Sequence, residues 1–310
     1  MKRDQMKKKN DSIRRAADKK KEARNQVKAK AYKQKDSSRG GRPAKKRSAE
    51  NEAEVSYETQ QRRPLKNGEK AYKLLAAQMD ISNAKAKDLI DRGLVYVGNK
   101  KVMIARGDLD VKTIFTVREI AKVRPIFEND DLIVVDKPAF MNADEVEHQF
   151  KGAQLLHRLD RETSGVLILV KNEAFREQAI AEFKNDRVYK EYVAWVEGIV
   201  TEEIMIDKPI LTEKRHNKAY SKISNKGKPA RSEVYPLEVS GKKSKVKVII
   251  HEGRTHQIRT HLRSVEHPIV GDELYGGRRA ERVMLHAKKV ELMGMTFEAK
   301  EPKIFAHFGS

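Results

Sequence analysis

A short stretch of the chain, Leu155–Val170, joins charged residues to an apolar run and reads LLHRLDRETSGVLILV. Asp160 lies between Arg158 and Arg161, and a Thr-Ser-Gly turn separates it from the apolar residues. Nearby cations favour the ionised form of a carboxylate, and that form is what a nucleophile or a general base needs near neutral pH. A string of this kind is also common as a weak structural ion pair. These residues alone leave both interpretations open.

Four further segments follow this stretch along the chain and contain candidate motif residues. They are KEYVAWVEG, EGRTHQIRTHL, HPIVGDELYGG and RVMLHA, in that order. Together with LLHRLDRETSGVLILV, they resemble the ordered motifs of the RluA-type RNA pseudouridine synthases. One such match arises by chance, whereas five in the family's order do not. The resemblance covers residues 124–306.

The resemblance implies an isomerisation of uridine to pseudouridine within RNA and assigns roles to four residues. Asp160 matches the essential aspartate, and Arg259 matches the basic residue that pairs with it, expected here on a distant strand. Tyr192 matches the tyrosine that packs on the target uracil and is a candidate for proton transfer. Arg158 resembles the arginine that enters the RNA stack when the uridine leaves it. We also expect Arg254 to contact RNA.

Each of these catalytic assignments has an alternative. Tyr192, on an alternating strand, has the spacing of a core or interface aromatic, and Arg259 has the chemistry of a phosphate clamp. The sequence also leaves open whether Asp160 attacks the anomeric carbon of the sugar or removes a sugar proton to give a glycal. Both routes require an ionised carboxylate.

The reaction implied by the resemblance needs no cofactor and no metal, since nothing is oxidised and no group is transferred in. The sequence agrees, because it has no cysteine and therefore no thiolate ligands. Three histidines are spaced by five residues, which fits neither a helical pair nor a known zinc pattern: His251, His256 and His261. We expect His256 and His157 to serve in packing and hydrogen bonding rather than as general bases.

The residues around these motifs predict the fold class. Several short strands with few intervening helices indicate an α+β domain with a mixed, mainly antiparallel sheet. The expected strands are DDLIVVDKP, GVLILVK, KEYVAWVEG, SEVYPLEVS and KVKVII, and the expected helix is NEAFREQAIAEFK. One region departs from the family: Ala139-Phe140 follows DDLIVVDKP, and the loop after it is short and acidic. A basic segment at 212–230 is expected to form an RNA-gripping hairpin, with a plain solvent loop as the alternative.

A small domain is expected in front of the catalytic one, at residues 65–120. Its order of helix, helix, strand, turn and strand resembles the S-four RNA-binding domain. Ser82 is a candidate N-cap for the second helix, which Gly93 would close. Lys85, Lys87 and Arg92 would then lie on the helix that meets phosphates, although exposed helix cations often serve only solubility.

Residues 1–64 form a third part, a basic tail that we expect to be largely disordered. Met1–Glu50 holds 20 Lys and Arg against 6 Asp and Glu, so these 50 residues carry +14 of the net charge of +21. A basic excess of this size attracts nucleic acid. The sequence shows neither a signal peptide nor a membrane span, so we expect a cytoplasmic protein. A monomer is the expected oligomeric state in the absence of any signal for another.

Two other classes of function compete with the synthase. A ribosome-assembly factor with a degenerate enzyme domain would bind RNA without reacting, but degeneration should have removed Asp160, Tyr192 or Arg259. A nuclease would need a carboxylate cluster for metals or a suitable pair of histidines, and we find neither. Ribosomal RNA of the large subunit is the expected substrate, and transfer RNA remains open.

Overall fold

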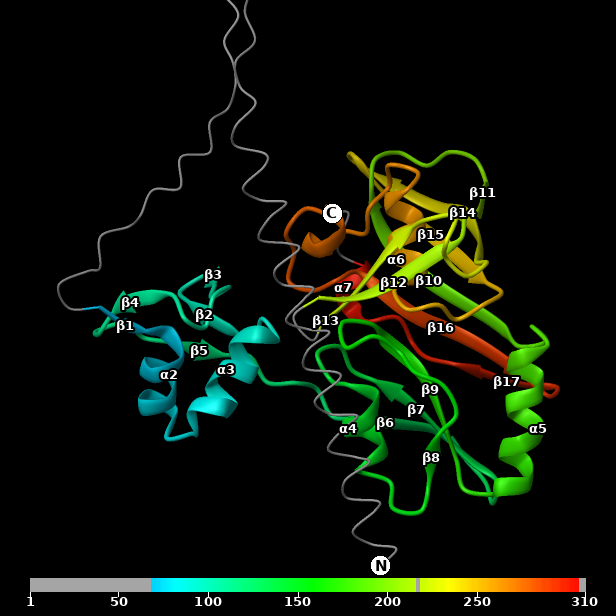
Figure 1. The fold of residues 1–310 in the computed structure, drawn as a ribbon, viewed down its shortest axis with the longest axis horizontal. Coiled ribbons are helices and arrows are strands. Elements are labelled where there is room, and N and C mark those ends of the chain that lie inside the picture. Colours follow the sequence, from blue (N-terminus) through cyan, green and yellow to red (C-terminus); the bar gives the residue numbers. More distant parts are fainter. Residues whose placement is uncertain (1–67, 216–217, 307–310) are drawn as a thin grey trace, which may run out of the picture. The chain divides into compact units, whose positions relative to one another are not determined.

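The computed structural model describes residues 68–215 and 218–306, and the predicted tail lies outside them (Figure 1). No helix in the described part is long and apolar enough to cross a membrane. The first elements are two helices and five short strands: β1 (Gly68–Lys70), α2 (Ala71–Met79), α3 (Asn83–Asp91), β2 (Val95–Val97), β3 (Lys100–Lys101), β4 (Asp108–Asp110) and β5 (Thr116–Val117).

Local sequence signals explain these front elements. The Ser82 side chain accepts a hydrogen bond from the Lys85 amide at 3.2 Å, so Ser82 caps α3 as predicted. Gly93 has a φ of +72° just after the helix, the conformation that glycine adopts most readily. Strand β2 pairs antiparallel with both β3 and β5. The assignment of these residues to an S-four domain stays a prediction.

The rest of the described chain is built on a ten-stranded sheet. Eight strands follow the order β11-β14-β15-β10-β16-β9-β7-β6, while β17 pairs with β16 and β8 pairs with β9. Within the described strands, β9 and β16 run parallel and the other pairs are antiparallel, which confirms the α+β class. The strands are β6 (Arg124–Glu128), β7 (Leu132–Lys137), β8 (Gln154–Leu155), β9 (Ser164–Val170), β10 (Tyr189–Glu197), β11 (Ile204–Asp207), β14 (Arg231–Ser240), β15 (Lys243–Ile250), β16 (Leu285–Leu292) and β17 (Met295–Glu298).

Helices and one separate hairpin complete this domain. The helices are α4 (Ala143–Glu147), α5 (Glu173–Lys184), α6 (Gln257–Arg263), the short 3-10 helix η1 (Glu273–Tyr275) and α7 (Lys303–Ala306). Strands β12 (Ile210–Arg215) and β13 (Lys218–Ile223) pair antiparallel within the basic segment expected to form a hairpin. All five predicted strands and the predicted helix are present.

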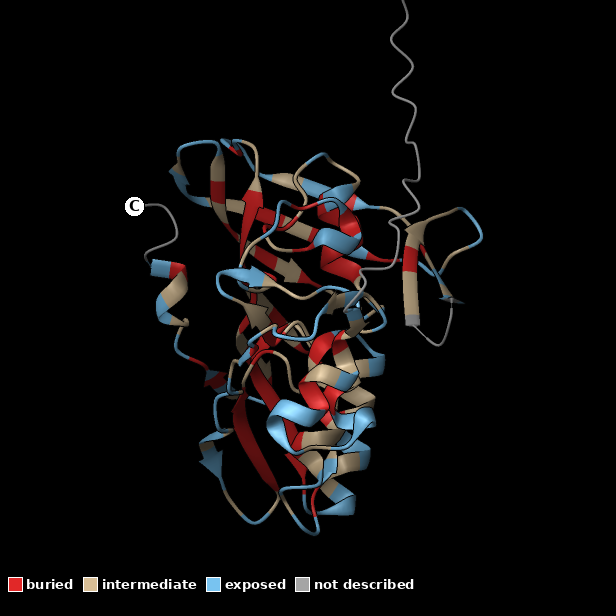
Figure 2. Ribbon diagram, turned by 90° about the vertical axis from the view of Figure 1, so that its left-hand side faces the viewer, coloured by how far each residue is buried: buried red, intermediate tan, exposed pale blue. Residues whose placement is uncertain are grey.

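The burial pattern explains why the strands differ in sequence. Every residue of β7 and β9 is buried, so both read as nearly continuous apolar runs. Strand β15 alternates buried and partly exposed residues, as expected when one face is covered. Strand β10 lies between β15 and β16, and its Trp195 is fully buried, with the indole N–H donating to the Phe305 carbonyl at 3.0 Å. Figure 2 colours the buried residues of the sheet red and the partly exposed ones tan.

Gly165 permits the close approach of β9 and β16 and provides a stability prediction. Its φ is +115°, and a Cβ there would lie 2.1 Å from the Ala287 carbonyl oxygen. We expect Gly165→Ala to lower the free energy of unfolding by about 3 kcal/mol or more, since strain and overpacking add. Urea denaturation measures the loss.

Gly152→Ala is the matched control for Gly165→Ala. Gly152 has a φ of +81°, but nothing lies within 4 Å of the place that a Cβ would occupy, so only the backbone conformation is penalised there. We expect a loss of about 1 kcal/mol in this variant. Equal losses in the two variants would show that the contact with Ala287 does not limit residue 165.

Candidate active site

Asp160 lies in the loop that leads into β9, and its carboxylate is paired with neither of its sequence neighbours. Oδ2 lies 3.3 Å from Nη1 of Arg259 and 3.9 Å from Nε2 of His256. Arg158 pairs instead with Asp144, and Arg161 with Glu162. The partner of the carboxylate thus comes from 99 residues further along the chain. The side chain of Asp160 is 25% exposed, which leaves it accessible from the cleft.

Arg259 lies on helix α6, so the expectation that it comes from a strand is wrong. His256 adopts a left-handed conformation, and the chain then turns into a helix that packs its Ile258 and Leu262, four residues apart, in the core. The guanidinium is buried and bidentate to Asp272, with Nε–Oδ2 at 2.6 Å and Nη2–Oδ1 at 2.9 Å. Arg259 therefore has a fixed position next to Asp160.

The carboxylates of Asp272 and Asp160 stabilise the positive charge of Arg259. Burial alone lowers the pKa of Arg259, but hydrogen bonds and charge from Asp272, with the charge of Asp160, raise this pKa above its ordinary value. A buried guanidinium with two carboxylates stays protonated. It can therefore orient the Asp160 carboxylate, which lies 3.3 Å from Nη1.

Tyr192 lies on β10, at the point where the register with β16 shifts. Its ring lines the same cleft as Asp160. Burial, followed by the negative charge of Asp160, raises the pKa of the Tyr192 phenol above its ordinary value. The phenol is therefore protonated near neutral pH and offers a hydrogen-bond donor and an aromatic face to whatever enters.

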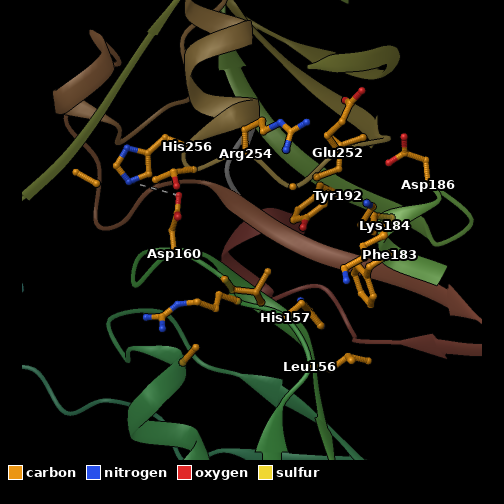
Figure 3. Close-up of a pocket in the computed structure, with 18 of the residues that line it drawn as sticks. Leu156, His157, Asp160, Phe183, Lys184, Asp186, Tyr192, Glu252, Arg254 and His256 are labelled. Atoms are coloured by element: carbon orange, nitrogen blue, oxygen red, sulfur yellow. Dashed lines mark ion pairs between the residues drawn. The ribbon is translucent and has the colours of Figure 1, made fainter. Parts of the chain in front are cut away.

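Asp160, Tyr192 and His256 are among the residues that line a cleft of about 1140 Å³. Figure 3 shows Asp160 and His256 at one end, Tyr192 and Arg254 in the middle, and Glu252 near Asp186 at the other. Cavities that bury a drug-sized molecule measure about 300–1,000 Å³, so this cleft has room for more than one nucleotide.

Four of the predicted catalytic and RNA-binding residues line this cleft: Asp160, Tyr192, Arg158 and Arg254. Arg259 lines a smaller pocket that those four residues also line. Arg254 is tied to the 226–230 loop through a hydrogen bond from Nε to the Pro229 carbonyl at 2.9 Å. The hairpin approaches the cleft too, because the Tyr220 ring stacks on Tyr275 with centroids 5.5 Å apart.

The three predicted RNA-binding residues of the front part lie on or just after α3 and are not among the residues that line this cleft. Lys85 is exposed, and the Lys87 ammonium lies 4.1 Å from the centroid of the Tyr72 ring. The Arg92 side chain is only 9% exposed and pairs with Asp88 at 2.9 Å and with Glu145 at 2.6 Å. A role in binding RNA stays a prediction for all three.

Two residues at this site, Asp272 and Tyr275, had no role predicted from the sequence. The Tyr275 hydroxyl lies 2.8 Å from Nδ1 of His256 and accepts a hydrogen bond from the Ser221 amide at 2.8 Å. Burial lowers the pKa of His256, which is consistent with the hydrogen-bonding role expected for this histidine. Both residues lie within HPIVGDELYGG, so the motif contained the signal, although it did not say which of its residues face the site.

The chain and its fold have counterparts among known proteins. The chain matches the family RNA pseudouridylate synthase over residues 131–264. It is 50% identical over 240 residues to an uncharacterized RNA pseudouridine synthase of Helicobacter pylori strain J99, covering 76% of this chain and 99% of that protein. Ribosomal large subunit pseudouridine synthase D of Pasteurella multocida is 26% identical over 234 residues, covering 64% of this chain and 70% of that protein.

A solved structure extends this likeness to the fold. Human RNA pseudouridylate synthase domain containing 1 is 29% identical, with a TM-score of 0.53, over 59% of this chain and 84% of that one. The chain therefore belongs to the RNA pseudouridine synthase family. It is an isomerase that acts on uridine in RNA.

Proposed function

We propose that this enzyme converts specific uridines of large-subunit ribosomal RNA to pseudouridine, with Asp160, Tyr192 and Arg259 as its catalytic residues and without a cofactor. The observation that carries the proposal is the Asp160–Arg259 pair, 3.3 Å apart, at a cleft that Tyr192 also lines. Support for a ribosomal substrate comes from the similarity to a synthase named for the large ribosomal subunit.

The chemistry breaks one glycosidic bond and forms another. The bond from uracil N1 to the sugar C1′ breaks, the base rotates within the cleft, and C5 bonds to C1′. The hydrogen on C5 then leaves as a proton, and N1 gains one, so atoms and electrons balance without a co-reactant. Asp160 either bonds to C1′ or takes a sugar proton to give a glycal, and both routes use it ionised.

The substrate uridine must leave its stack to reach Asp160, at a cost of a few kcal/mol that is smallest in loops. In this proposal Arg158, 66% exposed at the cleft, fills the space that the uridine leaves. Tyr192 packs on the extruded uracil. Arg254 contacts the RNA backbone, since a guanidinium suits phosphate geometry.

The other parts of the chain would add affinity. We assign residues 65–120 to an S-four-like domain whose Lys85, Lys87 and Arg92 contact phosphates, residues 124–306 to the catalytic domain, and residues 1–64 to a basic tail that contacts RNA without sequence preference. The enzyme would act as a monomer in the cytoplasm.

Release of tritium tests this proposal. Large-subunit ribosomal RNA and transfer RNA are transcribed with tritium on C5 of uracil and incubated with the protein. We expect label to appear in water from the ribosomal RNA, because isomerisation replaces that hydrogen. Release from transfer RNA alone would reassign the substrate. Binding of both RNAs without release from either would favour an assembly factor.

The Tyr192 hydroxyl and ring can be tested separately. Tyr192→Phe keeps the ring, so we expect KM to stay within about threefold while kcat falls by about 10²-fold, the effect typical of a lost proton-transfer group. Tyr192→Ala also loses the ring, and we expect a further loss of about 1–3 kcal/mol in binding the extruded base. Single-turnover kinetics on the ribosomal substrate measures both. A Phe variant with normal kcat would limit Tyr192 to stacking.

A further inference from the structure

We infer that Asp144 is a positioning residue that holds Arg158 at the edge of the cleft in the RNA-free protein, and that RNA with an extrudable uridine takes Arg158 from it. The two side chains form a bidentate pair, with Nη1–Oδ1 and Nη2–Oδ2 both at 2.9 Å. This inference rests on the proposed function, because it concerns the arginine that is proposed to replace the flipped uridine.

Asp144 is held in a fixed place by the start of α4. The Asn142 side chain and Glu145 form a capping box, in which the Asn142 amide donates to Glu145 Oε2 at 2.7 Å. Ala143 and Val146 anchor the same helix in the core. The carboxylate therefore projects from a rigid support.

The loop that carries Arg158 is attached to the same support. The buried Lys137 ammonium donates to the Met141 carbonyl at 2.7 Å and to the Arg161 carbonyl at 3.4 Å. The Phe140 amide also donates to the Arg161 carbonyl, at 2.7 Å. These hydrogen bonds connect the chain before α4 to the 158–161 loop. The Arg158–Asp144 pair therefore forms between two segments that are held together.

The pair has the strength expected of an exchangeable contact. Both side chains are exposed, Arg158 by 66% and Asp144 by 50%, and exposed pairs contribute about 0.2–1 kcal/mol. Arg158 must leave Asp144 to enter an RNA stack, because stacking places its guanidinium between bases. A phosphate accepts the same bidentate geometry and can take over the hydrogen bonds.

Exchange breaks the Arg158–Asp144 pair, so RNA that takes Arg158 must offset the loss of that pair. RNA that offers an extrudable uridine gains the stacked Arg158 and offsets this loss. A fully paired duplex does not supply that gain. Asp144 would therefore favour substrates, because it withholds Arg158 from RNA that cannot accept it in a stack. Asp144 is one of the acidic residues after Ala139-Phe140, and on this account it makes RNA entry selective.

The test compares Asp144→Asn with Asp186→Asn, which removes the same charge from a residue that lines the cleft, whereas Arg158 is paired with Asp144. Dissociation constants are measured for large-subunit ribosomal RNA and for a fully paired RNA duplex. We expect Asp144→Asn to tighten duplex binding by about two- to fivefold more than Asp186→Asn does, and to reduce the preference for ribosomal RNA.

The same comparison in an Arg158→Ala background completes the cycle. The excess effect of Asp144→Asn should vanish there, because no arginine remains to be held. An excess that persists without Arg158, or no excess at all, overturns the inference. A fall in the urea midpoint of Asp144→Asn would also overturn it, since a positioning role leaves the fold intact.

These outcomes are separate from failure of the proposed function. If the wild type releases no tritium from any RNA, the proposed function fails, yet the binding cycle still decides the role of Asp144. If tritium is released normally and the cycle shows no coupling to Arg158, only the role of Asp144 fails.

Discussion

Asp160→Asn is expected to stop tritium release from the ribosomal substrate, with a loss of at least about 10³-fold in kcat, because the amide can neither attack C1′ nor take a proton. The dissociation constant for RNA should change by less than about threefold, since affinity rests on phosphate contacts elsewhere. The variant should also fold, because Arg259 keeps its bidentate contact with Asp272.

A matched control separates this chemical effect from a general effect of the substitution. Asp207→Asn makes the same change at an exposed position on β11 and should retain the activity of the wild type. Turnover by Asp160→Asn within tenfold of the wild type would remove Asp160 from the mechanism. Loss of RNA binding together with activity would instead make Asp160 part of the binding surface.

Asp272→Ala is expected to have the largest effect on stability. It would leave the Arg259 guanidinium, 5% exposed, with the 3.3 Å pair to Asp160 and the face of the Tyr275 ring 5.0 Å away, but without its bidentate carboxylate. Breaking a buried ion pair on one side costs about 3–5 kcal/mol, because the remaining charge stays desolvated. Urea denaturation followed by circular dichroism measures this loss in the free energy of unfolding.

The double variant Asp272→Ala/Arg259→Met tests that explanation. Removing both charges should recover most of the lost stability, since an apolar replacement for a buried pair is often neutral or stabilising. Activity should not return, because Asp160 would then lack its cation. If Asp272→Ala alone costs less than about 1 kcal/mol, the charge of Arg259 is compensated by water and the proposed rigidity of the site is wrong.

The sequence by itself determined the elements and the identity of the chemistry. Alternation and apolar runs predicted β7, β9, β10, β14 and β15, since burial on one or both faces of a sheet is recorded directly in residue order. Ser82 and Gly93 marked the limits of α3 for the same local reason. Asp160 stood out because its motif is contiguous in the chain.

Only the tertiary structure decided which charges meet. Asp160 faces Arg259, Arg158 faces Asp144, and Arg259 is held by Asp272. Local spacing could not predict these pairs, because the two partners of each pair are separated by 13 to 99 residues and are brought together only when the chain folds. The placement of Arg259 on a helix rather than a strand followed from packing around it, since a short apolar run has no period that separates the two. The sequence shows which residues are charged. Which partner a buried charge has depends on the fold, because the fold both removes the charge from water and places the partner beside it.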